Sequence, residues 1–258
     1  MNRTAVITLS NAGARLTARL AREMTSCDLF LHADVARRFA GERFDAVIPL
    51  TKRIFKRYAE FVYIMPCGVV ARALDGLPRH KTRDPAVVVV DVGGRWAVSL
   101  LSGHEGGANA LALRVANALA AEPVITTTTE AVKDMIVGVG CRRGAPAADI
   151  VAAVREALRL ARVRPARVRW MASADLKKNE AGLLAAAQEL GFGLRFISAD
   201  EIRGTAKAFR HSRFVQNKVK LPAVAEPAAL LAGRRTTLWL PKTIIHGVTV
   251  AVARENCL

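Results

Sequence analysis

Short apolar runs rich in β-branched residues alternate with helical patterns along the chain, and this alternation constrains the fold more than any other feature. The run AVVVVDV at 86–92 is typical of a buried strand, whereas 146–161 repeats its apolar residues at the spacing of one helix face. Gly93 and Gly94 separate two such runs and suit a tight hairpin turn. The alternation predicts the α/β class, with two α/β domains that each contain a largely parallel sheet with helices on its faces.

The same patterns place the individual elements and the boundary between the domains. We expect strands at 4–10, 28–32, 61–66, 86–92, 95–101, 122–128, 135–140, 166–172, 192–198, 236–242 and 247–253. We expect helices at 12–24, 52–60, 68–74, 146–161, 176–190 and 227–233, and one more that ends near 121. The predicted domains are 1–131 and 135–258, joined by a short connector near 129–134. The basic, weakly patterned segment 203–222 is expected to be a surface loop.

Composition excludes several classes of protein. An apolar content of 52% permits a sizeable core, yet no apolar run reaches the roughly 18 residues that a membrane-spanning helix needs. The N-terminus reaches Asn11 and Arg15 too soon for a signal peptide, so we expect a cytoplasmic protein. The four cysteines and five histidines are widely scattered, which predicts reduced thiols and no protein-bound metal.

The net charge of +17 is the most unusual property of the composition. A field of that sign attracts anions, so nucleic acid, a membrane surface and a small polyanion are all compatible with it. A coat of arginines on surface helices explains the same excess without any ligand.

The segment SLLSGHEGGANALALRVANAL at 99–119 changes from a strand pattern to a helical pattern through three glycines. Open α/β folds tend to bind ligands at such a turn, at the carboxyl end of a strand. After Ser102, we expect Gly103, Gly106 and Gly107 to let a bulky ligand approach the backbone. We also expect the N–H groups at the helix start to attract an anion.

Three side chains of this segment are suited to chemistry. His104 exchanges a proton near neutral pH, Glu105 orients it or acts as a base, and Asn109 hydrogen-bonds the ligand. In the alternative interpretation, Asn109 caps the helix, the glycines only form a turn, and His104 is solvated.

Two other turns before or after predicted strands carry polar groups. Cys67 and Gly68 open a short helix, where the thiol has a lowered pKa or is simply a small buried hydrophobe. Lys81 and Asp84 precede the strand at 86–92, where Lys81 binds a carboxylate or the two residues form an exposed ion pair.

The run VGVGCRRG places Gly138, Gly140 and Gly144 in a strand-to-helix turn. The spacing is one residue off the dinucleotide fingerprint, and no acidic residue follows about 20 positions later to bind a ribose, which disfavours nicotinamide binding. Arg142 and Arg143 make the turn suitable for an anion, or else they are a solvated pair.

The block 67–131, and above all its run LLSGHEGGAN, resembles the N-terminal and linking part of cobalt-precorrin-5A hydrolases of anaerobic cobalamin synthesis. The runs VGVGCRRG, DLKKNEAGL, AVAEPAALLAG and LPKTIIHGVTVAVA resemble the C-terminal domain of that family. The resemblance is weakest over 1–45 and 203–220. This chain is a short form, because longer members carry an extra segment where Thr129 and Ile136 are nearly adjacent here. If the missing segment closes over the macrocycle, we expect the short form to be slower or to need a partner protein.

The resemblance implies a hydrolase that opens the ring A δ-lactone of cobalt-precorrin-5A and releases acetaldehyde to give cobalt-precorrin-5B. The cobalt belongs to the substrate, so no cofactor is expected. Backbone amides and Asn109 would polarise the acyl oxygen, while His104 with Glu105 would move the proton. Glu180 and Glu226 bind the substrate or pair with nearby basic residues. The expected substrate-binding residues are Cys67, Gly68, Arg72, Lys81, Asp84, Ser102, Gly103, Gly106, Gly107, Gly140, Arg142, Arg143, Lys177, Glu180, Glu226 and Lys242.

Two other functions compete with this one. The C-terminal half also resembles stand-alone proteins of the aerobic pathway, which favours a non-catalytic corrinoid-binding or carrier protein. Nucleic-acid binding is suggested by charge alone and opposed by the lack of a binding motif and by an aromatic content of only 5%. We expect neither nucleic acid nor membrane as a partner, and the sequence leaves open a homodimer and contacts with neighbouring pathway enzymes.

Overall fold

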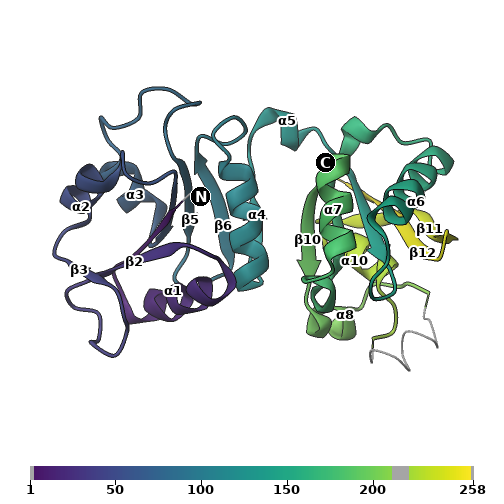
Figure 1. Cartoon of the computed structure of the whole chain (residues 1–258), viewed down its shortest axis with the longest axis horizontal. Coiled ribbons are helices and arrows are strands. Elements are labelled where there is room, and N and C mark those ends of the chain that lie inside the picture. Colours follow the sequence, from purple (N-terminus) through teal and green to yellow (C-terminus); the bar gives the residue numbers. More distant parts are fainter. Residues whose placement is uncertain (1–2, 211–220, 257–258) are drawn as a thin grey trace. The chain divides into compact units, whose positions relative to one another are not determined.

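The computed structural model describes residues 3–210 and 221–256. Its contacts divide the chain into unit 1, Met1–Thr127, and unit 2, Thr128–Leu258, each with its own sheet (Figure 1). The division falls at the start of the short helix α5 (Thr128–Ala131), just before the connector expected near 129–134. Both units layer helices on a sheet, which confirms the predicted α/β class.

Unit 1 contains a seven-stranded sheet in the order β3-β2-β1-β4-β5-β6-β7. Its elements are β1 (Thr4–Thr8), α1 (Asn11–Glu23), β2 (Cys27–His32), β3 (Glu42–Phe44), α2 (Val47–Ile54), β4 (Glu60–Ile64), α3 (Cys67–Ala73), β5 (Ala86–Val90), β6 (Trp96–Leu101), α4 (Ala108–Leu119) and β7 (Glu122–Val124). Alternate residues of the central strands point to opposite faces. Val6 and Val62 pack with α1 and α4, whereas Ile7 and Phe61 pack with α2 and α3.

One strand reversal decides which loops of unit 1 lie together. All neighbouring strands are parallel except β5 and β6, which form the predicted hairpin at Gly93–Gly94 and pair Val87 with Leu101. The carboxyl end of β6 therefore lies at the edge where β1, β4 and β5 begin. We call the side of the sheet where β1, β4 and β5 begin its amino edge, and the side where these strands end its carboxyl edge.

Unit 2 contains a five-stranded sheet in the order β10-β9-β8-β12-β11. Its elements after α5 are β8 (Met135–Gly140), α6 (Ala147–Leu160), the 3-10 turn Pro165–Arg167, β9 (Val168–Ala174), the 3-10 turn Asp175–Lys177, α7 (Ala181–Leu190), β10 (Gly193–Ile197), α8 (Ala199–Gly204), α10 (Ala225–Leu231), β11 (Thr236–Ile245) and β12 (Val248–Glu255). Strands β8, β9 and β10 are parallel, but β12 is antiparallel to both β8 and β11. This sheet is thus mixed rather than largely parallel, because the chain ends in a hairpin whose turn residues His246 and Gly247 both have positive φ.

Close packing explains the first glycine of the VGVG run. A Cβ on Gly138 would lie 1.9 Å from the carbonyl oxygen of Ala225, so the bare backbone of β8 lets α10 rest directly on it. Helices α6 and α7 cover the other face of the sheet, where Val137 and Val139 belong to their core cluster. Gly138 is therefore a packing residue inside the strand.

Several local predictions differ from the structure. The helix expected at 52–60 lies earlier, as α2, because the chain must be extended again at Glu60 to pair with β1. The helix expected at 176–190 is broken, since Asp175–Lys177 form a 3-10 turn and α7 begins only at Ala181. Of the loop expected at 203–222, residues 211–220 lie outside the described residues.

Candidate functional site

The loop 102–107 joins β6 to α4 at the amino edge of unit 1. Ser102 is buried and has a φ of 58°, a left-handed conformation that costs a non-glycine residue roughly 1 kcal/mol. A Cβ on Gly106 would lie 2.3 Å from the Ser102 Cβ and 3.0 Å from the Lys81 carbonyl oxygen. Gly106 thus allows the loop to pack against the segment before β5. Gly107 has a φ of 88° and open space around it, so its conformation is what requires glycine.

The start of α4 is less available to an anion than the sequence predicts. The backbone N–H groups of Ala108 and Asn109 donate to the carbonyl oxygens of Ser102 and Gly103, at 3.1 and 2.9 Å. The left-handed turn at Ser102 folds these carbonyls back over the helix. These two N–H groups, which were expected to attract an anion, are therefore already paired within the loop.

Asn109 is part of the framework of the loop. Its side-chain oxygen accepts a hydrogen bond from the Ser99 hydroxyl at 2.8 Å, and its amide nitrogen donates to the Thr127 hydroxyl at 2.9 Å. A Cβ on Gly103 would lie 2.6 Å from the Thr127 methyl carbon, so these groups are tightly packed. Asn109 does not cap α4, because Gly107 occupies that position. The amide ties β6 and the segment after β7 to the helix and so fixes the position of the loop.

His104 and Glu105 lie at the exposed tip of the loop. The Glu105 carboxylate accepts a hydrogen bond from Lys81 Nζ at 2.6 Å, and this bond lowers the pKa of Glu105 below its usual value. A carboxylate with a lowered pKa is a weak base. Glu105 is therefore poorly suited to act as the base.

Asp84 structures the neighbouring loop before β5. One of its carboxylate oxygens accepts the backbone N–H groups of Arg79 and His80, both at 2.7 Å. Its own N–H donates to the His80 carbonyl at 2.9 Å, which closes the turn. The ion pair considered between Lys81 and Asp84 is absent, because Lys81 pairs with Glu105.

Cys67, Gly68 and Arg72 lie at the other side of the sheet. They belong to α3, which follows the carboxyl end of β4, whereas Lys81 and the loop 102–107 lie at the amino edge. The five residues of β4 separate the two edges by about 16 Å. Cys67 is exposed, and the Arg72 guanidinium donates to the Gly68 carbonyl at 3.1 Å. The structure therefore does not bring these residues together with His104.

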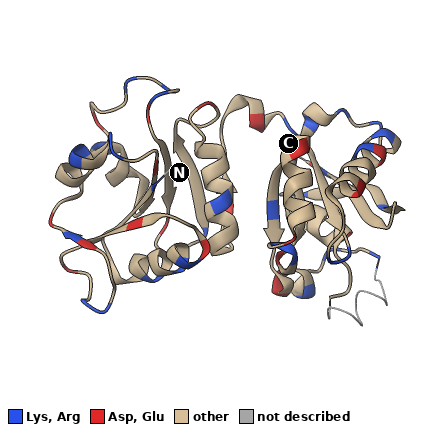
Figure 2. Ribbon diagram, in the orientation of Figure 1, with Lys and Arg blue, Asp and Glu red and all other residues tan. Residues whose placement is uncertain are grey.

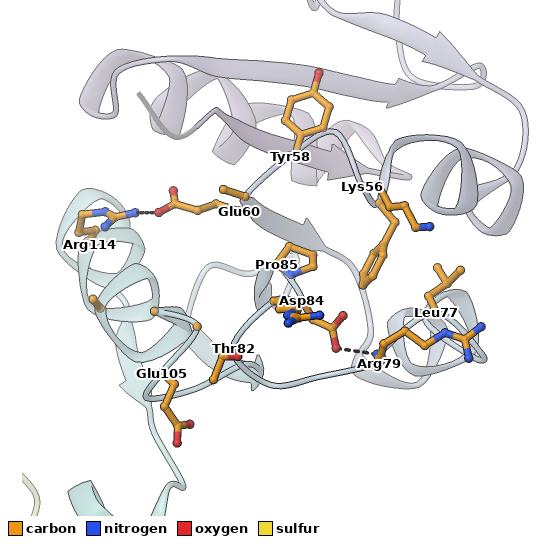
Figure 3. A pocket seen from close by; sticks show the side chains of 16 residues that line it. Lys56, Tyr58, Glu60, Leu77, Arg79, Thr82, Asp84, Pro85, Glu105 and Arg114 are labelled. Atoms are coloured by element: carbon orange, nitrogen blue, oxygen red, sulfur yellow. Dashed lines mark hydrogen bonds and ion pairs between the residues drawn. The ribbon is translucent and has the colours of Figure 1, made fainter.

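A cavity of about 660 Å³ lies beside the loop at the amino edge (Figure 3). Its walls come from the segments after α2 and before β5, from the loop 102–107 and from α4. Figure 3 shows Arg114 of α4 facing Glu60 of β4, and their side chains form an ion pair of 2.6 Å. The cavity is lined by Phe55, Lys56, Tyr58, Ala59, Glu60, Leu77, Arg79, Thr82, Arg83, Asp84, Pro85, Glu105, Gly106, Gly107, Ala110 and Arg114.

The sequence did not reveal Lys56, Arg79, Arg83 and Arg114 as site residues. Arg79 and Arg83 flank the predicted site residue Lys81 in the basic run RHKTR. That run could have indicated them, since its basic residues flank a turn before a buried strand. Lys56 and Arg114 carry no local signal, because only the pairing of β4 with β5 brings the segment after α2 to the same cavity as α4.

In unit 2 the predicted residues gather where β8 and β9 end. Glu180 accepts the Gly144 N–H at 2.7 Å and the Lys177 ammonium at 3.1 Å, and these bonds lower the pKa of Glu180. Lys177 and Glu180 are nearly buried, with side chains 12% and 10% exposed, so they hold the turn after β8 in place. Gly140 ends β8, and Arg142 and Arg143 make no ion pair within residues 3–210 and 221–256.

Glu226 is buried and its carboxylate binds backbone N–H groups, whereas the sequence suggested the substrate or a basic side chain as its partner. Its carboxylate oxygens accept the N–H groups of Arg210 and Lys242, at 2.6 and 2.8 Å. The Lys242 N–H lies where the register of β11 against β12 shifts, between Leu240 and Thr243. Glu226 therefore satisfies the Lys242 N–H, which the irregular ladder leaves unpaired, and also the N–H of Arg210 in the segment after α8.

The described part of the chain has neither a cluster of metal-ligating side chains nor a membrane-spanning helix. No group of three His, Cys, Asp or Glu side chains there is placed to hold a metal ion. None of the helices described is both long and apolar enough to cross a membrane. Basic residues occur on helices, strands and loops of each unit (Figure 2).

Comparison with known proteins identifies the family. The model described as "Cobalamin synthesis G N-terminal" matches residues 49–130, and "Cobalamin synthesis G C-terminus" matches residues 135–253. Together the two models account for most of the chain in the order of its two units. The chain belongs to the cobalamin synthesis G family.

Individual relatives of this family member carry names from the same pathway. A cobalt-precorrin-5A hydrolase of Salmonella typhimurium is 47% identical over 79 residues, which are 31% of this chain and 22% of that protein. The hydrolase of Priestia megaterium is 23% identical over 352 aligned positions, covering 96% of this chain and 94% of that protein. Protein CobE of a Sinorhizobium species is 34% identical over 49% of this chain and 83% of its own length. These matches confirm the predicted family resemblance.

Proposed function

We propose that this member of the cobalamin synthesis G family hydrolyses cobalt-precorrin-5A, opening the ring A δ-lactone and releasing acetaldehyde to give cobalt-precorrin-5B. One observation carries the proposal: both halves of a family that includes named cobalt-precorrin-5A hydrolases are present in order on one chain. The exposed imidazole beside a cavity at the amino edge supports it, because lactone hydrolysis needs a group that moves protons near neutral pH.

The loop 102–107 supplies the proton-transfer group in this proposal. His104 accepts a proton from the attacking water and returns it to the departing fragment or to the ring. Glu105, ionised and paired with Lys81, stabilises the imidazolium that forms. Asn109 holds the loop in register through Ser99 and Thr127, so its role is positioning rather than direct polarisation of the acyl oxygen.

The main competing function is a corrinoid carrier without catalysis. The match to Protein CobE favours it, since about half of this chain corresponds to most of a protein that stands alone. A carrier would bind the macrocycle without changing it. The two functions therefore differ in product and not in binding.

Acetaldehyde release separates the two functions. Purified protein incubated with cobalt-precorrin-5A is expected to release acetaldehyde, detected by coupled reduction with alcohol dehydrogenase. We expect His104→Ala to lower turnover by about 10²- to 10⁴-fold while binding changes little. The matched control is His246→Asn, an exposed histidine in the turn of unit 2, which should retain full activity. Binding of the substrate without acetaldehyde or a spectral change would support the carrier, and unchanged turnover in His104→Ala would remove the imidazole from the mechanism.

A further inference from the structure

The cavity at the amino edge of unit 1 carries an excess of positive charge that the protein does not neutralise. The acidic residues in its wall all have partners: Glu60 binds Arg114 and the Thr4 hydroxyl, and Glu105 binds Lys81. Asp84 is occupied by two backbone N–H groups. The side chains of Lys56, Arg79 and Arg83 make no ion pair or hydrogen bond with any residue that the structure describes.

Two of these cations, Arg79 and Arg83, lie on a turn that hydrogen bonds hold in place. Asp84 accepts the N–H groups of Arg79 and His80, and the Arg83 N–H donates to the His80 carbonyl at 2.9 Å. A 2.8 Å hydrogen bond between His80 Nδ1 and the Thr82 hydroxyl also stabilises this turn. Arg79 and Arg83 therefore project from a backbone that is already ordered, so less entropy is lost when they bind a ligand.

The remainder of the wall is apolar or aromatic. Phe55, Tyr58, Leu77 and Pro85 contribute carbon surface between the cations, and Gly106 and Gly107 leave room beside the loop that carries His104. A ligand that suits this wall has a broad apolar face fringed by several carboxylates. A volume of about 660 Å³ admits one edge of such a ring with its acidic arms.

We propose that Lys56, Arg79 and Arg83 form a carboxylate-binding rim. This rim binds the acidic arms of a tetrapyrrole and holds its ring against the loop 102–107. The proposal rests on the proposed function for the identity of the ring, but the recognition of carboxylate arms is independent of turnover. Arginine forks bind carboxylates in two-point contacts, which gives orientation as well as attraction. The three residues are positioning residues, because they hold the arms and not the reacting atoms.

The test uses two corrinoids that differ in their arms. Cobyrinic acid carries free carboxylates, whereas cobinamide carries amides on the same ring. We expect Arg79→Glu combined with Arg83→Glu to weaken cobyrinic acid binding by tenfold or more and to leave cobinamide binding within twofold. The control is Arg15→Glu combined with Arg19→Glu, which changes the net charge equally on exposed positions of α1 outside the cavity. That control should lose less than twofold, and thermal unfolding would show that both variants are folded.

The outcomes separate this inference from the proposed function. Equal losses in the two double variants would overturn the rim, since only the overall field would then matter. Equal weakening of cobinamide binding would also overturn it, because recognition would not be of carboxylate arms. If cobyrinic acid binding follows the prediction but the wild type releases no acetaldehyde, the rim stands and the hydrolase proposal fails. If the wild type releases acetaldehyde and the KM is unchanged in Arg79→Glu with Arg83→Glu, the hydrolase stands and the rim fails.

Discussion

Replacing Glu226 by glutamine should destabilise unit 2 strongly, although the substitution changes only one oxygen into an amide. The side chain is 1% exposed, and both carboxylate oxygens accept backbone N–H groups. Glutamine offers one acceptor, so its NH₂ group must face either the Arg210 N–H or the Lys242 N–H, donor against donor. A buried donor left without a partner costs roughly 1–3 kcal/mol, and a hydrogen bond to a charged acceptor contributes about 1.5–3 kcal/mol. We therefore expect a loss of about 2–4 kcal/mol.

Calorimetry of the full chain measures this loss. Unit 2 spans Thr128–Leu258, and an unfolding entropy of about 2.1 cal/mol/K per residue converts the loss into a fall in Tm of roughly 7–14 °C. The control is Glu189→Gln in the same unit, where a side chain 54% exposed pairs with Arg155 at 3.4 Å. That substitution should cost less than about 1 kcal/mol. A Glu226→Gln protein that melts within 2 °C of the wild type but no longer binds cobyrinic acid would refute the structural role. Such a result would show that Glu226 binds the ligand instead.

Three further predictions concern the charged groups. Because Lys81 lowers the pKa of Glu105, carbon-detected NMR should show Glu105 titrating below its ordinary value of 4.5 in the wild type and near that value in Lys81→Met; an equal value in both would exclude the ion pair. Arg167 lowers the pKa of Asp134, so this pair stabilises unit 2 above the unfolded value of 3.8 and the stabilisation is lost as pH falls through the lower folded value. The Tm difference between wild type and Asp134→Asn should accordingly shrink below about pH 3.8, and a difference that grows there would contradict the sign. Asp84→Ala should make the loop before β5 the first site of limited proteolysis, and an unchanged cleavage pattern would show that the carboxylate does not hold the turn.

The sequence alone determined the layers of this protein and the identity of its loops. Hydrophobic periodicity is a local property, so the alternation of strand and helix patterns was enough to predict two α/β domains. The Gly93–Gly94 pair predicted the β5–β6 hairpin, because a two-residue turn joins antiparallel strands. The run LLSGHEGGAN indicated the family by its residues alone, since so specific a string of glycines and polar groups needs no spatial information to be matched.

Tertiary structure decided which of these loops face one another. The reversal at β6 places His104 at the amino edge, about the length of β4 away from Cys67, although both follow the carboxyl end of a strand. Tertiary contacts also pair Glu105 with Lys81 and place the buried Glu226 against the backbone N–H groups of Arg210 and Lys242, neither of which a linear pattern expresses. The physical reason is that strand direction and side-chain partners depend on pairings between distant segments, and those pairings are settled by burial across the whole sheet.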